Sequence, residues 1–216
     1  MGPVIEVVSD VVCPWCFIGK RRLEKALELI GRQDVAVHWK AFELNPGAPP
    51  EGLDRREYRI RKFGSLAYSE QLEARVAAAG AAEGIAFRFD RIARVPNTFH
   101  AHRLIWLAGR EGAQDAVVER LFRAYFLEGE NVGDPAVLRR IGEECGVPLA
   151  GEEGAEEVRA ELRDARACGV QGVPTFFIAG RAVASGAHPA ESLASFLGEP
   201  LAPVAARCGI DDNSCG

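Results

Sequence analysis

Two cysteines three residues apart are the part of this 216-residue chain best suited to redox chemistry. The segment Cys13-Pro14-Trp15-Cys16 follows a run of β-branched residues and precedes a helical pattern. Residues three apart on a first helical turn lie on the same side of the helix, so their sulfurs can form a short disulfide. The spacing therefore indicates thiol–disulfide exchange, with packing or metal binding as the alternatives.

The expected position of Cys13 at a helix start favours its thiolate. Free backbone N–H groups and the positive end of the helix dipole meet there and stabilise a negative charge. Pro14 and Trp15 would tune the site: the proline needs no N–H in a first turn, and the indole offers an apolar face. We expect Cys13 to form a mixed disulfide with the substrate and Cys16, one turn deeper, to resolve it.

The elements that must position this pair have the order β-α-β. Residues 3–8 are dense in Val and Ile, and residues 35–40 alternate apolar with polar types, so both predict strands. The intervening helix is indicated by an apolar stripe that ends before Gly31 and consists of Leu23, Ala26, Leu27 and Ile30. This connection predicts two parallel neighbouring strands.

Helical patterns dominate residues 45–165. A loop rich in Pro and Gly opens this region at residues 45–50. Pro96 is expected in the first turn of one helix, and Asp134-Pro135 is expected to cap another and begin its first turn. The helices are therefore predicted to be inserted into a split α/β domain.

Strand residues return at 175–178 and turn back in a hairpin, before a last helix that Pro189 opens. The first of these strands follows Gly172-Val173-Pro174. A proline that enters a central strand removes a ladder N–H and needs a local reason. One reason is a substrate site in which the Val173 backbone pairs with a bound peptide like an added strand; the alternative is an ordinary trans proline at an edge strand.

Four ordered segments of the chain resemble the FrnE branch of the DsbA-like thioredoxin superfamily. They are residues 9–16 (SDVVCPWC), 42–46 (FELNP), 96–104 (PNTFHAHRL) and 172–176 (GVPTF). The resemblance implies a thioredoxin-like α/β fold (β-α-β … β-β-α), a disulfide oxidoreductase or isomerase activity, a cis peptide bond before Pro174, and a bacterial cytoplasmic protein.

On this basis the chain is expected to divide into three parts. Residues 1–44 and 166–200 would form the thioredoxin-like domain, residues 45–165 the helical insertion, and residues 201–216 a tail. The tail holds Cys208 and Cys215. They are either a secondary redox pair or two unrelated exposed cysteines, and the sequence favours neither interpretation. A zinc site built from both cysteine pairs has the right number of ligands but an unusual spacing, so we expect no metal.

Composition restricts the partners. The net charge is −5, with 26 Lys and Arg against 31 Asp and Glu, and this argues against nucleic acid. No apolar run approaches the roughly 20 residues of a membrane span, and no secretory signal is visible, so we expect a cytoplasmic protein. Its expected partners are protein substrates with thiols or disulfides, and a small thiol or a reductase for recycling. We expect no cofactor beyond the redox-active disulfide, and glutathione is a candidate co-substrate.

Two other functions remain open at this stage. One is a glutathione-dependent isomerase or transferase of the 2-hydroxychromene-2-carboxylate isomerase and kappa type, but those relatives usually carry Ser at the position of Cys13. The other is a redox-gated chaperone or metal-binding module. Whether the enzyme oxidises, reduces or isomerises depends on its reduction potential, which the sequence does not fix.

Two further polar residues are candidates near the cysteines. Asp10 precedes Cys13 by three residues, and either relays a proton or shapes the turn. His102 is expected to be exposed or to cap a helix, with a position in the cleft as the alternative. Cys145 and Cys168 are expected to be core residues.

Overall fold

The computed structural model describes residues 4–32, 35–149 and 151–198, and its centre is a four-stranded sheet. The strand order is β2-β1-β5-β6. β1 runs parallel to β2, whereas β5 is antiparallel to both β1 and β6. The parallel pairing of β1 with β2 and the hairpin of β5 and β6 are as predicted. The bounds of the strands are Val4–Ser9 for β1, Ala36–Ala41 for β2, Thr175–Ile178 for β5 and Arg181–Ser185 for β6.

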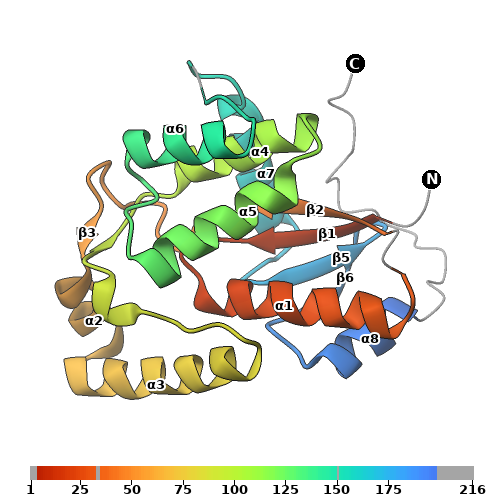
Figure 1. Cartoon of the computed structure of the whole chain (residues 1–216), viewed down its shortest axis with the longest axis horizontal. Coiled ribbons are helices and arrows are strands. Elements are labelled where there is room, and N and C mark those ends of the chain that lie inside the picture. Colours follow the sequence, from red (N-terminus) through yellow and green to blue (C-terminus); the bar gives the residue numbers. More distant parts are fainter. Residues whose placement is uncertain (1–3, 33–34, 150, 199–216) are drawn as a thin grey trace.

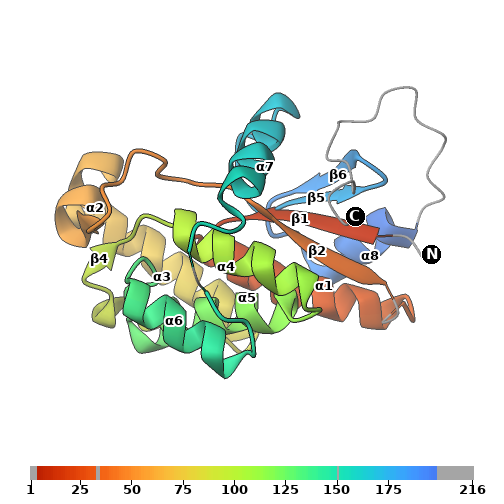
Figure 2. The same cartoon turned by 90° about the horizontal axis from the view of Figure 1, so that it is seen from above.

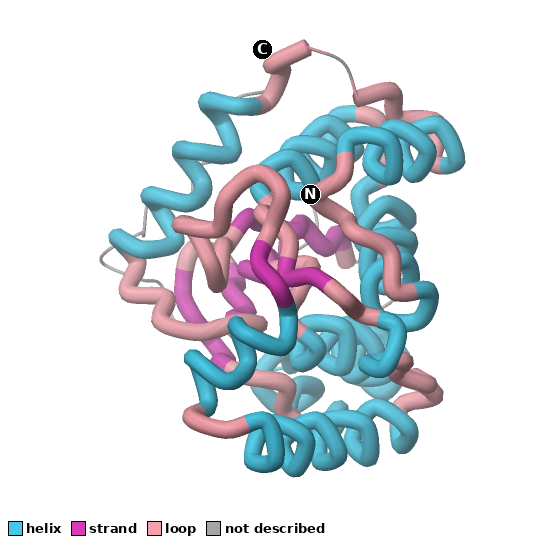
Figure 3. The backbone as a smooth tube through the Cα atoms, turned by 90° about the vertical axis from the view of Figure 1, so that its left-hand side faces the viewer, coloured by secondary structure: helices cyan, strands magenta, loops and turns pink. Residues whose placement is uncertain are grey.

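Helices cover both faces of this sheet (Figures 1 and 2). α1 (Pro14–Leu29) and α8 (Ala190–Gly198) pack together on one face, and α7 (Ala155–Ala167) lies on the other. Because strand side chains alternate, Val7 belongs to the large core beside α1, while its neighbour Val8 packs with Ala165 of α7. The two central strands are therefore largely buried on both sides, and Figure 3 shows the strands surrounded by helices.

The region between β2 and α7 is mainly helical, as predicted. Its elements are α2 (Arg55–Phe63), α3 (Leu66–Ala82), a 3₁₀ turn (Phe89–Arg91), α4 (Phe99–Arg110), α5 (Gln114–Arg123), a π-helical turn (Ala124–Glu128) and α6 (Pro135–Glu144). The carboxylate of Asp134 accepts the Ala136 N–H at 2.8 Å, so the predicted cap at the start of α6 is confirmed. None of the helices in the described ranges combines the length and apolar character needed to cross a bilayer.

One local prediction in this region is wrong. Pro96 does not lie in the first turn of α4, because that helix begins at Phe99 with Thr98 as its N-cap. Pro96 instead follows β4 (Arg94–Val95), which pairs with β3 (Leu53–Asp54) in a small antiparallel ribbon. Each of these strands has two residues, too few for an alternating pattern to be visible in the sequence.

Aromatic rings join α1 to the helical region. Phe17 stacks on Phe122 with centroids 5.0 Å apart, and it meets the edge of Phe87 at 6.1 Å. All three rings belong to one continuous hydrophobic core. The helix that carries the cysteines therefore packs against the helical region as well as against the sheet.

The backbone of the edge strand β2 also depends on this helical region. The side chain of Gln114 accepts the Trp39 N–H at 2.8 Å and donates to the Trp39 carbonyl at 3.2 Å. A carboxylate oxygen of Glu161 accepts the Ala41 N–H at 2.9 Å. Helices α5 and α7 thus satisfy polar groups that an open sheet edge would leave unpaired.

Glycine at position 19 allows the loop before β5 to approach α1. A Cβ atom on Gly19 would lie 2.8 Å from Cγ of Pro174. We expect Gly19→Ala to lower the free energy of unfolding by about 1–3 kcal/mol, the usual cost of overpacking. Urea unfolding measures it, with Gly47→Ala as control because a Cβ there meets no atom within 4 Å. Equal stabilities of the two variants would contradict the close contact.

Candidate active site

Cys13 is the N-cap of α1, and Pro14 is the first helical residue, as the sequence predicts. The Cys13 N–H donates to the Asp10 carbonyl at 3.0 Å, which closes the turn from β1. The Cys13 carbonyl in turn accepts the Cys16 N–H at 3.0 Å, the first bond of the helix. This geometry places Cys13 where free N–H groups and the helix dipole stabilise a thiolate.

The two thiols have different surroundings. Both are free, but Cys13 is 5% exposed and Cys16 is 0% exposed. Burial raises the pKa of the Cys16 thiol well above its ordinary value, and hydrogen bonding to Cys13 and a charge on Cys13 raise it further, against smaller opposing effects of Ser9 and Asp10. Cys16 therefore stays protonated at neutral pH, and Cys13 is the thiol that a substrate can reach.

The loop before β5 faces Cys13, although 160 residues separate them along the chain. The Val173–Pro174 peptide bond is cis. The Cys13 Sγ lies 3.5 Å from the Val173 carbonyl oxygen, to which its thiol donates. Within the described part of the chain, the Val173 N–H donates no hydrogen bond. The two predicted components of the site therefore lie in contact.

A cavity of about 580 Å³ opens beside Cys13. Trp15 lies at its rim and is 39% exposed. Most of the wall is apolar and comes from α1, α2, α3 and the π-helical turn, which contributes Tyr125 and Phe126. The helical region between β2 and α7 thus forms most of the wall of the space that Cys13 faces.

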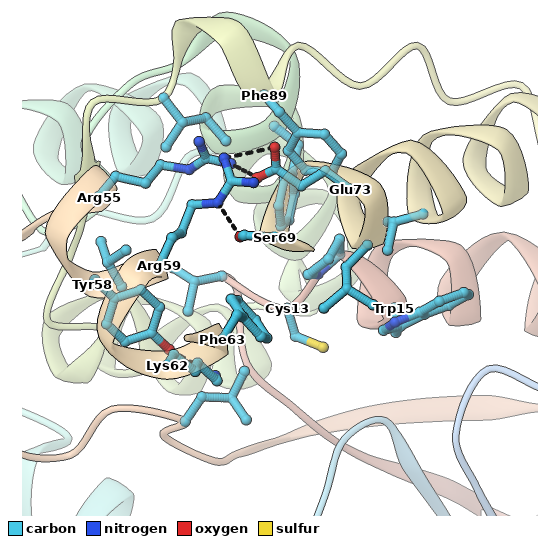
Figure 4. Close-up of a pocket in the computed structure, with 18 of the residues that line it drawn as sticks. Cys13, Trp15, Arg55, Tyr58, Arg59, Lys62, Phe63, Ser69, Glu73 and Phe89 are labelled. Carbon is cyan, nitrogen blue, oxygen red and sulfur yellow. Dashed lines mark hydrogen bonds and ion pairs between the residues drawn. The ribbon is translucent and has the colours of Figure 1, made fainter. Parts of the chain in front are cut away.

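Polar side chains of α2 and α3 gather in one part of this cavity, and the sequence analysis did not identify them. Figure 4 shows Arg55 and Arg59 converging on Glu73, away from Trp15. Arg59 Nη1 lies 2.7 Å from the Glu73 carboxylate, and Arg59 Nε donates to Ser69 at 2.6 Å. Arg55 also forms an ion pair with Glu73. The only sequence signal was the i, i+4 spacing of the two arginines, which is equally typical of a solvated helix face.

Asp10 and His102 form a buried polar pair beneath the turn that carries Cys13. The Asp10 carboxylate accepts the Leu44 N–H at 2.8 Å, and its other oxygen lies 3.5 Å from His102 Nε2. The same His102 nitrogen lies 2.9 Å from the Phe42 carbonyl oxygen. The expectation that His102 is exposed is wrong, since both side chains are buried. An isolated histidine in the sequence gives no sign of a partner 92 residues away.

The surroundings of His102 make stability depend on pH. Burial lowers its pKa, but hydrogen bonding and attraction from Asp10, followed by attraction from Glu43 and Glu161, outweigh burial, so the pKa is raised. The folded state therefore binds the proton more tightly than the unfolded state, whose histidine titrates near about 6.5. This stabilising contribution is complete below that pH and is lost as the pH rises through the folded pKa.

We therefore expect His102→Gln to reduce the pH dependence of the free energy of unfolding. The difference between wild type and variant should be largest near pH 6 and decrease at higher pH, with a slope of at most about 1.4 kcal/mol per pH unit. Urea unfolding between pH 6 and pH 9 measures this difference. A difference that grows with pH would contradict the raised pKa of His102 in the folded state.

The remaining cysteines are separate from this site. Cys145 is half-buried, at the C-cap of α6, and is less enclosed than a core residue. Cys168 is disulfide-bonded. Cys208 and Cys215, the predicted secondary redox pair, lie outside the described residues. Within the ranges that the structure covers, no three His, Cys, Asp or Glu side chains gather as metal ligands.

Comparison with known proteins agrees with this geometry. The family model "DSBA-like thioredoxin domain" matches residues 4–198. YwbO of Bacillus subtilis (strain 168) is 30% identical over 182 residues, which cover 81% of this chain and 86% of YwbO. The solved structure of a probable DsbA oxidoreductase from Streptomyces coelicolor has a TM-score of 0.81 and 34% identity, and the match covers 100% of this chain and 97% of that one.

A more distant structure shares the fold. A 2-hydroxychromene-2-carboxylate isomerase has a TM-score of 0.68 at 17% identity, with 90% of this chain and 94% of that chain covered. The family match spans all described residues, including the cysteine pair and the Val173–Pro174 loop. The chain therefore belongs to the DsbA-like thioredoxin family.

Proposed function

We propose that this protein is a thiol–disulfide oxidoreductase in which Cys13 is the nucleophile and Cys16 resolves the mixed disulfide. The observation that carries this proposal is the asymmetry of the pair. Cys13 borders the cavity at a helix start, whereas Cys16 is fully buried and its pKa is raised by burial. Of the two sulfurs, only Cys13 can both reach a substrate and be stabilised as a thiolate by the helix.

In the reductive direction, the Cys13 thiolate attacks one sulfur of a substrate disulfide. A Cys13–substrate disulfide forms, and the other substrate sulfur leaves as a thiolate. Cys16 then loses its proton and attacks Cys13, which releases the second substrate thiol and leaves the Cys13–Cys16 disulfide. The oxidative direction is the same sequence reversed, so two electrons move in either case.

The loop before β5 would hold an extended substrate during these steps. The free Val173 N–H can pair with the backbone of a bound chain, as in strand addition. Pro174 packs closely against Gly19 and so fixes the loop relative to α1. We therefore propose Val173 and Pro174 as substrate-binding residues, and Pro14 and Trp15 as residues that tune the site.

The finer assignments are also proposals. We infer that the enzyme belongs to the FrnE branch, acts in the cytoplasm of a bacterium, and is recycled by a small thiol such as glutathione or by a reductase. Residues 45–165 would be an insertion domain that shapes the substrate site, since α2, α3 and the π-helical turn line the cavity.

Trapping of the mixed disulfide tests the assigned roles. We expect Cys16→Ser to accumulate a mixed disulfide on Cys13 after treatment with 2-hydroxyethyl disulfide, because no resolving thiol remains. Peptide mass spectrometry after acid quenching locates the adduct. Wild type should instead release the adduct and form its internal disulfide.

The matched control is Cys145→Ser, which removes a free thiol that does not line the cavity and should behave like wild type. An adduct that is absent in Cys16→Ser would contradict the proposal. An adduct located on Cys145 rather than Cys13 would contradict it equally.

A further inference from the structure

One guanidinium nitrogen of Arg59, which lines the Cys13 cavity, has no hydrogen-bond partner among the residues that the structure describes. Arg59 is 7% exposed, and its Nε and Nη1 atoms are engaged by Ser69 and Glu73. Its Nη2 atom is buried and has no hydrogen-bond acceptor among the described residues. A buried donor without an acceptor costs free energy, and most such groups in proteins are satisfied. A ligand that supplies an acceptor would give all three guanidinium nitrogens of Arg59 a partner.

The charge around this nitrogen favours an anion. Arg55 and Arg59 share the single carboxylate of Glu73, so the three side chains carry a net charge of +1. Lys62 and Arg75 also line the cavity, which therefore has four cationic side chains and one acidic one. The whole chain has a net charge of −5, so this positive cavity is a local feature and not a consequence of overall composition.

The shape of the cavity favours a small ligand. Its volume of about 580 Å³ is within the usual range for small-molecule sites. Cys13 and Arg59, which would contact the two ends of the ligand, are 5% and 7% exposed. A ligand that contacts both recessed groups at once has to enter the cavity, and a small molecule can do so.

We propose that the cavity binds a low-molecular-weight thiol or disulfide that carries a carboxylate, with Arg59 as the carboxylate anchor and Arg55 as its electrostatic support. The inference rests on the proposed exchange at Cys13 and adds the ligand class and the residues that select it. Arginine suits this role because its guanidinium stays charged, and its unpartnered Nη2 can donate a charge-assisted hydrogen bond to a carboxylate.

Recycling of the enzyme would then proceed as two balanced steps. The thiolate of the small molecule attacks the Cys13 sulfur of the Cys13–Cys16 disulfide, which forms a mixed disulfide and releases the Cys16 thiolate, which takes a proton. A second molecule attacks the sulfur of the first, releasing the small disulfide and the Cys13 thiolate. Two small thiols are oxidised, and one enzyme disulfide is reduced.

Three small disulfides of different charge test the proposal. The reduced enzyme is mixed with 3,3′-dithiodipropionate (anionic), 2-hydroxyethyl disulfide (neutral) or cystamine (cationic), and oxidation of Cys13 is followed by acid quenching and mass spectrometry. Each rate is divided by the rate of the same disulfide with dithiothreitol, which removes differences in intrinsic reactivity. We expect the normalised rate to be about tenfold or more higher for the anion than for the neutral compound, the effect of one charge-assisted hydrogen bond, and lowest for the cation.

Substitutions assign this preference to the cluster. Arg59→Gln should remove most of the preference for the anion, measured as the ratio of the anionic to the neutral rate within the same variant. Glu73→Gln should increase the preference, because it removes the competing carboxylate. Arg61→Gln, on the same helix but exposed and outside the cavity, is the matched control and should behave like wild type.

The outcomes separate this proposal from the proposed function. Reaction of all three disulfides at equal normalised rates overturns the carboxylate site but leaves the exchange activity intact. No reaction of Cys13 with any of them overturns the proposed function itself. If Arg59→Gln does not fold, Glu73→Gln decides, and an unchanged preference there overturns the role of the cluster.

Discussion

Replacing Cys13 by serine is expected to reduce disulfide exchange by roughly a thousandfold or more, because a serine hydroxyl is not ionised at neutral pH and cannot form a disulfide. Insulin reduction with a chemical reductant for recycling measures the rate. The fold should survive, since sulfur is replaced by oxygen at an N-cap position where serine is favoured. The unfolding transition should therefore remain close to that of wild type.

The comparison with Cys145→Ser makes this result specific. That variant also loses one free thiol, but Cys145 lies at the end of α6 and does not line the cavity. It should retain full activity. Activity that survives in Cys13→Ser, or that disappears in Cys145→Ser, would move the chemistry to another cysteine.

Truncation of Phe17 to alanine is expected to lower the free energy of unfolding by about 3–5 kcal/mol, the usual range for a buried aromatic side chain. Its ring is fully buried and stacks on Phe122, with centroids 5.0 Å apart and planes 12° apart, and it lies 6.3 Å from Phe126. The loss is large because removal of the ring would leave an empty space between α1 and the helical region that holds Phe122 and Phe126.

Urea unfolding of Phe17→Ala and Phe17→Leu separates packing from aromatic stacking. Phe17→Leu keeps most of the volume and should cost markedly less than the alanine variant. A decrease in the free energy of unfolding of less than about 1 kcal/mol for Phe17→Ala would contradict a core shared by α1 and the helical region. Such a value is typical of surface positions or of sites that collapse freely.

Local patterns in the sequence were sufficient to predict the sheet and the position of the cysteines. The β-branched run before Cys13 and the apolar stripe after it act over a few residues, and they correctly place the pair between β1 and α1. The cap at Asp134 is equally local. Patterns of this kind identify an element but not its neighbours in space.

The contacts among distant segments could not be predicted in this way. The four segments that carry the family resemblance meet at one place: Asp10 accepts the Leu44 N–H, His102 lies against the Phe42 carbonyl, and Cys13 faces Val173. The sequence showed four separate motifs but not that they form a single network. The burial of His102 follows from this network and from no property of its own helix.

The arginine cluster was missed for a different reason. Arginine is usually exposed, so Arg55 and Arg59 on an amphipathic helix indicate a solvated face. Only the packing of α2 against α3 shows that Arg59 is buried and shares Glu73 with Arg55. A buried charge of this kind is costly and is retained where it serves a site or a specific structure, which is why it directs attention to the cavity.

The most direct test of the account is a glutathione redox titration of the wild-type protein, followed by acid quenching and differential alkylation of each cysteine. We predict that Cys13 and Cys16 become protected together as a two-electron couple, with a tenfold change in their ratio for about each 30 mV, while Cys145 remains alkylatable after unfolding throughout. Cys13 and Cys16 that remain free thiols over the whole range, or that become protected independently of each other, would contradict the assignment of this pair as the redox centre.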